Sequence, residues 1–180
     1  MDNHALTQRR KKMRLENFDY GSPGAYFVTI VTYQHEKLFG VIEKEVVTLN
    51  PIGVVVQKTW LEIPEHFPET SLSAFVVMPN HLHGIIIIND NCVVGATHES
   101  PLHNNNCIRD RTRSLGIIIG LFKSTASKRI HQLNFAKQKN VWQRNYYDHI
   151  IRSDDDYQRI VDYIELNPSS WEQDTEYIPE

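Results

Sequence analysis

Apolar residues recur along this chain with two different periods, and the change of period separates predicted strands from predicted helices. Residues 26–33 (YFVTIVTY) are rich in β-branched and aromatic side chains, which favour a strand. Residues 72–78 (LSAFVVM) and 81–88 (HLHGIIII) have the same character, and only Pro79 and Asn80 lie between them. Because parallel strands need a long crossover, a connection this short indicates an antiparallel pair.

Three segments combine helical spacing of apolar residues with a capping residue at their start. The expected helices run from Asn50 to about Glu62, from Ser114 to about Ile130, and from Ser153 onward. Shorter strands are expected at 46–49, at 141–142 and at 146–151. Mixed strands and helices around an antiparallel pair predict an α+β fold.

The chain is expected to form one domain with a polar segment at each end. Residues 1–17 are predicted to be a basic arm, residues 18–171 the single domain, and residues 172–180 an acidic tail. Residues 90–113 have little apolar content and are predicted to form a long surface loop, a kind of segment that is typically functional or disordered. No internal repeat or second-domain linker is visible in the sequence.

The composition is that of a soluble globular protein, with 41% hydrophobic and 23% charged residues among 180. No apolar run reaches the roughly 18 residues of a membrane helix, and the polar N-terminus lacks the apolar region of a secretion signal. Cys92 and Cys107 are too few for a disulfide scaffold. We therefore expect a cytoplasmic protein that does not enter a membrane.

The net charge of −3 argues mildly against a nucleic-acid partner, but the charges are unevenly distributed. A basic cluster at the N-terminus could bind phosphates, or it could be an ordinary solvated terminus. The cluster consists of Arg9, Arg10, Lys11, Lys12 and Arg14.

His81 and His83 are the first candidates for chemistry. Side chains alternate between the two faces of a strand, so these imidazoles point the same way and could hold one cation. Leu82 points into the opposite layer. A pair with this spacing is also common among ordinary surface or hydrogen-bonded histidines.

Tyr163 and Asn167 are the second candidates. They are four residues apart on the last helix, so they lie on one flank of its apolar stripe and could face a cleft together. The alternative is a half-buried packing tyrosine and an asparagine at a helix end before Pro168. Taken together, the two features suit phosphodiester cleavage, in which a tyrosine attacks a phosphate polarised by a divalent cation. Imidazole and amide-oxygen ligands leave Mg²⁺ and Mn²⁺ both open.

Five segments carry a family pattern in order from residue 14 to residue 171. They are RLENFDYGSPGAYFVTIVTYQHEKLFG, FVVMPNHLHGIIII, SLGIIIGLFKS, VWQRNYYDHIIR and DYIELNPSSW, of which MPNHLHG and YIELNP are the most specific. Together they resemble the REP-associated tyrosine transposases, a branch of the IS200-like single-tyrosine HUH transposases. The resemblance implies that residues 18–171 form an HUH transposase domain with a ferredoxin-like antiparallel sheet flanked by helices.

The resemblance also implies roles for individual residues. His81 and His83 would be metal ligands, Asn167 the third ligand, and Tyr163 the nucleophile. The substrate would be single-stranded DNA with hairpin structure, cut to a 5′-phosphotyrosine and a free 3′-OH with the help of Mg²⁺ or Mn²⁺. Monomer and homodimer both remain open, because Tyr163 could complete its own site or that of a second copy.

Several other residues could compete for these roles or support them. Tyr146 and Tyr147 are rival nucleophiles in a run where packing is the more natural role, and His149 could assist the site or bond to Asp148. Further basic residues could contact the DNA backbone, and they are Lys123, Lys128, Arg129, Arg144 and Arg152. Two other functions stay open: an inactive hairpin-binding module of the same fold, and an unrelated metal hydrolase that uses the two histidines.

Overall fold

A computed structural model describes residues 18–90, 114–133 and 140–179. The predicted basic arm, with Arg9, Arg10, Lys11, Lys12 and Arg14, lies outside these residues, as does nearly all of the predicted loop at 90–113.

A four-stranded antiparallel sheet forms the centre of the molecule, with its strands in the order β4-β5-β1-β6. The strands are β1 (Gly24–Val31), β4 (Thr70–Val77), β5 (His81–Ile88) and β6 (Tyr147–Ile151). The predicted strands at 26–33, 72–78, 81–88 and 146–151 are therefore confirmed to within two residues at their ends. Trp142 forms only an isolated bridge to Thr32 rather than a strand.

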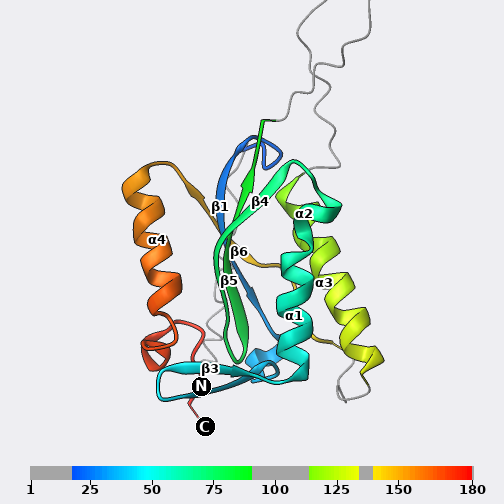
Figure 1. Cartoon of the computed structure of the whole chain (residues 1–180), viewed down its shortest axis with the longest axis vertical. Coiled ribbons are helices and arrows are strands. Elements are labelled where there is room, and N and C mark those ends of the chain that lie inside the picture. Colours follow the sequence, from blue (N-terminus) through cyan, green and yellow to red (C-terminus); the bar gives the residue numbers. More distant parts are fainter. Residues whose placement is uncertain (1–17, 91–113, 134–139, 180) are drawn as a thin grey trace, which may run out of the picture.

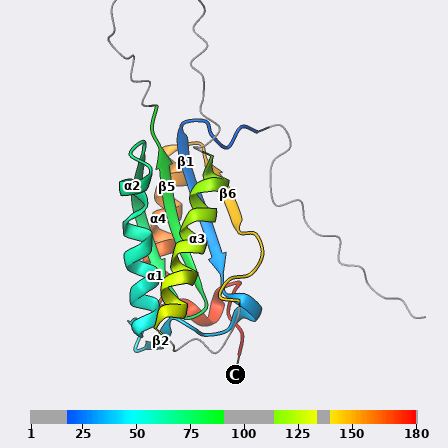
Figure 2. The same cartoon turned by 90° about the vertical axis from the view of Figure 1, so that its right-hand side faces the viewer.

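Helices cover both faces of the sheet. They are α1 (Pro51–Leu61), α2 (Ile63–His66), α3 (Leu115–Gln132) and α4 (Asp154–Leu166). The first three lie on one face and α4 lies on the other (Figures 1 and 2). The order β1-α1-β4-β5-α3-β6 is the ferredoxin-like arrangement, so the expected α+β class is confirmed. None of these helices is long and apolar enough to pass through a membrane.

The predicted helix starts are correct, although one cap works differently. The Asn50 side chain accepts hydrogen bonds from the Ile52 and Gly53 N–H groups at 2.9 and 3.0 Å, and the Ser153 hydroxyl accepts one from the Asp156 N–H at 3.2 Å. Ser114 stands at the N-cap of α3, but its side chain makes no capping bond. Ser114 therefore occupies the expected N-cap position but does not cap the helix through its hydroxyl.

A small separate hairpin joins β1 to α1. It pairs β2 (Gly40–Glu43) with β3 (Val46–Leu49), and only β3 was expected from the sequence. The two residues of its turn, Lys44 and Glu45, have φ values of 50° and 65°. Positive φ at both positions is the signature of the tight turn that suits the twist of a hairpin.

Alternation along the central strands divides the apolar side chains between two cores. On β1, Tyr26, Val28 and Ile30 point toward α1 and α3 and join the larger core. Phe27 points to the other face and packs with Ile85, Ile160 and Ile164 beneath α4. On β5 the same alternation places His81 and His83 on the α4 face, where the smaller core ends.

Gly84 follows His83 on β5 and faces Trp60 of the larger core, so a side chain at this position is expected to carry a penalty. A Cβ atom at Gly84 would lie 2.5 Å from Cζ2 of Trp60 and 3.2 Å from Cβ of Phe75. Gly84→Ala should therefore lower the free energy of unfolding by about 1–3 kcal/mol, measured by urea denaturation. At Gly120 on α3 an added Cβ would meet nothing within 4 Å. Gly120→Ala is the matched control, and it should raise stability by up to about 1 kcal/mol through helix propensity. Equal stability of the two variants would contradict this packing.

Candidate metal and nucleophile site

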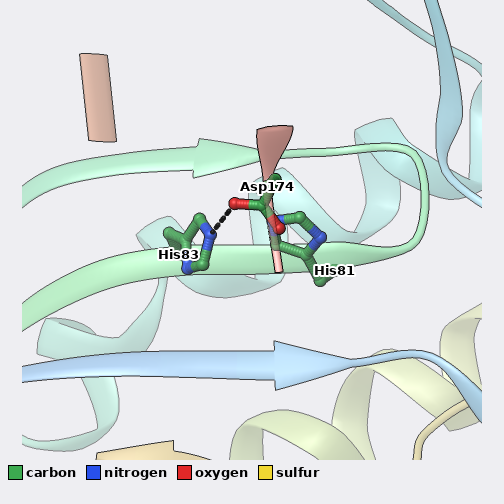
Figure 3. A group of neighbouring side chains, drawn as sticks. All are labelled: His81, His83 and Asp174. Atoms are coloured by element: carbon green, nitrogen blue, oxygen red, sulfur yellow. Dashed lines mark hydrogen bonds and ion pairs between the residues drawn. The ribbon is translucent and has the colours of Figure 1, made fainter. Parts of the chain in front are cut away.

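The two histidines of β5 lie side by side and are almost fully buried. The centroids of the two rings are 4.3 Å apart, and the residues are 0% and 2% exposed. Figure 3 shows both side chains on the same side of the strand, facing a carboxylate from the C-terminal segment. The expected common orientation is therefore correct, but the histidines are buried rather than on the surface.

Hydrogen bonds fix the protonation pattern of His81. The Asn80 amide nitrogen donates to the backbone carbonyls of His35 at 3.3 Å and Glu176 at 2.7 Å, which orients the amide. Its oxygen then faces Nδ1 of His81 at 2.8 Å, so Nδ1 must carry the proton. Burial, assisted by His83, lowers the pKa of His81 well below its usual value. His81 is therefore neutral, with a lone pair on Nε2.

His83 is held from the neighbouring strand. Its Nδ1 lies 2.8 Å from the hydroxyl of Thr29, its partner in the pairing of β1 with β5. This contact leaves Nε2 pointing toward α4 and the C-terminal segment. Both rings thus direct Nε2 into one space, and each is oriented by a hydrogen bond on its other nitrogen, as is usual for histidines that bind metals.

Tyr163 reaches this space from α4. Its hydroxyl is 3.2 Å from Nε2 of His83, and the two ring centroids are 5.1 Å apart. The phenol ring also packs edge-on against Phe27 at 6.0 Å, and 40% of the residue remains exposed. The imidazole pair and the phenol therefore converge, as the sequence hypothesis requires, within a single copy of the chain.

Asn167 also faces the site, one turn beyond Tyr163. It is 2% exposed, and its Oδ1 atom is buried without a hydrogen-bond partner. Nε2 of His81 is likewise buried and unpartnered. Buried acceptor atoms without a partner are costly unless something supplies the missing partner, and a cation would do so. The residues present therefore fit a divalent metal.

Asp174 is the member of the site that the sequence analysis missed. Its carboxylate accepts hydrogen bonds of 2.7 Å from both the Tyr163 hydroxyl and the Asn167 amide. It also lies 3.4 Å from Nε2 of His83 and 4.0 Å from Nε2 of His81. Ligand atoms of Asp174, His81 and His83 all lie within 4.8 Å of one another, so these three residues could hold a metal ion.

The surroundings of Asp174 keep it ionised. Its side chain is fully buried, which alone would raise the pKa. Hydrogen bonds from His83, Asn167, the Glu176 N–H and Tyr163 outweigh burial and hold the pKa of Asp174 far below its usual value. Conversely, burial together with the bond to Asp174 and its negative charge raises the pKa of Tyr163 well above its usual value. The phenol is therefore protonated in this arrangement.

A groove of about 300 Å³ opens beside the phenol. It is lined by Tyr163, Leu166, Asn167, Ser170, Gln173 and Asp174. Leu166 is 61% exposed at its edge. The site thus combines a buried ligand cluster with an open approach to the nucleophile candidate.

The rival tyrosines stand at the start of β6, and Tyr147 shares the Phe27 ring with Tyr163. Tyr146 packs against the larger core, on the side of α1 and α3. Tyr147 is 51% exposed on β6 and contacts Phe27 edge-on at 6.4 Å. Nε2 of His149 bonds to Asp156 of α4 at 2.8 Å.

The predicted basic contacts differ in how far they are engaged within the protein. Lys123 donates to the backbone carbonyls of Gln143 and Asn145 at 2.7 and 2.9 Å, and burial lowers its pKa to about 8. Arg129 pairs with Glu62 and contacts Thr59. The remaining described residues of this set are exposed, and they are Lys128, Arg144 and Arg152.

Comparisons with known proteins place the chain among its relatives. It is 39% identical to a protein of Haemophilus influenzae known only as "Uncharacterized protein", over 97% of both chains. It is 25% identical to a second protein of that organism, named "Putative REP-associated tyrosine transposase", over 83% of this chain and 73% of the relative. No family model matches the sequence.

A solved structure shares the fold. It is a REP-associated tyrosine transposase bound to a REP hairpin, with a TM-score of 0.57 and 21% identity over 88% of this chain and 74% of that one. This chain likewise has a ferredoxin-like sheet with His-Leu-His on a central strand, faced by one tyrosine from a helix. It is thus similar in sequence to a putative REP-associated tyrosine transposase and shares its fold with a solved one.

Proposed function

We propose that the protein is a transposase that cuts hairpin-containing single-stranded DNA through a covalent bond to Tyr163. The observation that carries this proposal is the position of the Tyr163 hydroxyl, 3.2 Å from Nε2 of His83 and 2.7 Å from the Asp174 carboxylate of the same cluster. The phenol is a nucleophile candidate at the edge of a ligand cluster, and the groove beside it admits a strand.

In the proposed reaction, the phenol oxygen of Tyr163 attacks the phosphorus of the scissile phosphodiester. The bond from phosphorus to the 3′-oxygen breaks, the phenol loses its proton, and the leaving oxygen gains one to become a free 3′-OH. The DNA stays attached through a 5′-phosphotyrosine, which divides strand transfer into two steps. Phe27 and His83 contact the phenol ring and limit its orientation.

A divalent cation is part of the proposal, with Mg²⁺ and Mn²⁺ as the candidates. His81 and His83 would hold it through Nε2, and Asn167 would supply its unpartnered Oδ1. When bound, it would polarise the scissile phosphate and offset the developing negative charge. Thr29 and Asn80 would keep the two imidazoles in the orientation that binding requires.

The proposed substrate is a DNA hairpin with a flanking single strand. A solved relative of the same fold is bound to a REP hairpin, which supports this substrate class. The exposed Lys128, Arg144 and Arg152 would contact phosphates, as would the basic arm. Lys123 and Arg129 would first have to give up their present partners to do the same.

The direct test is incubation of the protein with Mn²⁺ and a hairpin oligonucleotide that carries a single-stranded flank. The proposal predicts a DNA-linked protein that survives denaturing electrophoresis, together with a free 3′-OH product. Hairpin binding without any covalent product would favour an inactive binding module instead. Cleavage without a covalent product would favour a metal hydrolase that uses only the histidines.

Replacing Asp174 is expected to weaken Mn²⁺ binding and, at saturating Mn²⁺, to speed adduct formation. The carboxylate lies where an anionic phosphate must approach Tyr163, and it accepts the hydrogen bond of the phenol. Removing one like charge about 4 Å from a phosphate should speed adduct formation about 10-fold at saturating Mn²⁺. Asp174→Asn should therefore react faster, while needing more Mn²⁺ for half-saturation. Glu172→Gln removes the same charge from an exposed residue of the same segment and is the matched control. A slower reaction of Asp174→Asn at saturating Mn²⁺ would contradict this expectation, and it would be explained by a carboxylate that binds the metal or takes the phenol proton.

A further inference from the structure

Helix α4 carries Tyr163, yet its apolar contact with the sheet is small. Among the described α-helices, α1, α2 and α3 lie on one face of the sheet and α4 alone lies on the other (Figure 1). Its fully buried residues are Ile160 and Ile164, which pack against Phe27 and Ile85. Tyr157 and Val161 are partly buried beside them. An apolar stripe along one side of a helix resists separation of the helix from the sheet better than it resists rotation about the helix axis.

Two polar contacts at the first turn of α4 supply the missing restraint. The Tyr157 hydroxyl is hydrogen-bonded to the Ser73 hydroxyl of β4. The carboxylate of Asp156 bonds to Nε2 of His149 on β6 at 2.8 Å, and it also pairs with Arg159 one turn along the helix. The strand order β4-β5-β1-β6 makes β4 and β6 the opposite edges of the sheet. The helix start is therefore braced across the full width of the sheet, about 14 Å between the outer strands.

Local geometry explains how adjacent residues reach opposite edges. Successive side chains on a helix are about 100° apart, so Asp156 and Tyr157 point to different sides of its axis. On β4, the register shifts between Leu72 and Phe75, so that Ser73 and Ala74 oppose Ile85 alone. Such a bulge bends the strand and re-aims a side chain. Ser73 lies in this bulge and meets the phenol of Tyr157.

We infer that these contacts act as a rotational brace for α4 that sets the reach of Tyr163, with Ser73, Tyr157, His149 and Asp156 as positioning residues. The inference rests on the proposed role of Tyr163. Tyr163 follows Tyr157 by six residues, and its hydroxyl lies at the outer radius of the helix. A rotation of about 10° at a radius of roughly 6 Å moves a group by about 1 Å, and a misplacement of that size can reduce a rate by about 100-fold.

The test compares Tyr157→Phe, Ser73→Ala and the double variant with the wild type of the full chain. Each single variant should slow adduct formation about 10-fold at saturating Mn²⁺ and hairpin DNA, and the double variant should be no slower than either, because the two hydroxyls act as one pair. Affinities for Mn²⁺ and for hairpin DNA should not change. Ser73→Thr keeps a hydroxyl and should keep the rate. Tyr147→Phe removes a phenol hydroxyl from β6 and serves as the control.

Amide hydrogen exchange provides a readout that does not depend on activity. In Tyr157→Phe, exchange should increase in residues 154–166 while the central strands β1 and β5 exchange as in the wild type. If the wild type forms no adduct, the proposed function fails. The exchange of residues 154–166 in Tyr157→Phe then tests by itself whether the brace restrains α4. The inference would be overturned if Tyr157→Phe formed the adduct at the wild-type rate and if its residues 154–166 exchanged as in the wild type. A general increase in exchange with weaker DNA binding would also overturn it, because that pattern indicates a loss of overall stability.

Discussion

Tyr163→Phe is expected to abolish the covalent protein–DNA product while leaving the fold and DNA binding intact. The substitution removes only the hydroxyl, and the ring keeps its contacts with Phe27 and His83. Loss of a covalent nucleophile reduces a rate on the order of 10⁴-fold or more. Single-turnover assays with a labelled hairpin oligonucleotide measure this effect, and a binding assay in Mn²⁺ confirms that the substrate is still held.

The two rival tyrosines provide the controls for this experiment. Tyr146→Phe and Tyr147→Phe should form the adduct as the wild type does, because Tyr146 packs in the larger core and Tyr147 lies on β6. If Tyr163→Phe formed the adduct at the wild-type rate, the nucleophile would be a different residue. Loss of the adduct in Tyr147→Phe alone would point to β6 instead of α4.

Substitution of the histidine pair is expected to have the second largest effect. His81→Gln and His83→Gln keep most of the side-chain volume but remove the imidazole nitrogen that faces the site. Loss of one ligand should weaken Mn²⁺ binding by more than about 100-fold, since loss of even an outer partner of a ligand costs 10- to 100-fold. Adduct formation at limiting Mn²⁺ should fall in parallel. The signal of free Mn²⁺ in an electron paramagnetic resonance titration gives the affinity directly.

His66→Gln is the matched control for the histidine variants, because His66 is exposed on α2. It should bind Mn²⁺ as tightly as the wild type. Addition of a chelator to the wild type should stop adduct formation, and renewed Mn²⁺ should restore it. If both His81→Gln and His83→Gln bound Mn²⁺ with wild-type affinity, the two histidines would not be metal ligands.

The sequence could predict the central sheet and much of the site because those features depend on local periodicity. Alternation along 81–88 places His81 and His83 on one face, and the spacing of four places Tyr163 and Asn167 on one flank of α4. Segment 40–43 reads GVIE, too short and mixed to indicate a strand, and it is defined only by its pairing with β3. Helix α2 is a single turn and left no periodic signal.

Asp174 could not be predicted, for a different reason. It lies 91 residues from His83 in the chain, within an acidic segment that resembles an ordinary solvated tail. Its position depends on contacts that no local pattern encodes, such as Trp171 against the His81 ring at 5.7 Å and the bond from Asn80 to the Glu176 carbonyl. The one available signal was its spacing of seven residues from Asn167. Ligand candidates that are this far apart in the sequence can be identified only once the folded structure brings them together.

Two imidazoles of β5 and the phenol of α4 face one shared space, in which a single cation would bind. Anomalous X-ray scattering from a crystal grown with Mn²⁺ tests this most directly. We predict one strong peak within bonding distance of Nε2 of both His81 and His83, next to the Tyr163 hydroxyl. A peak at another position, or none in crystals that contain Mn²⁺ at saturating concentration, would contradict the account.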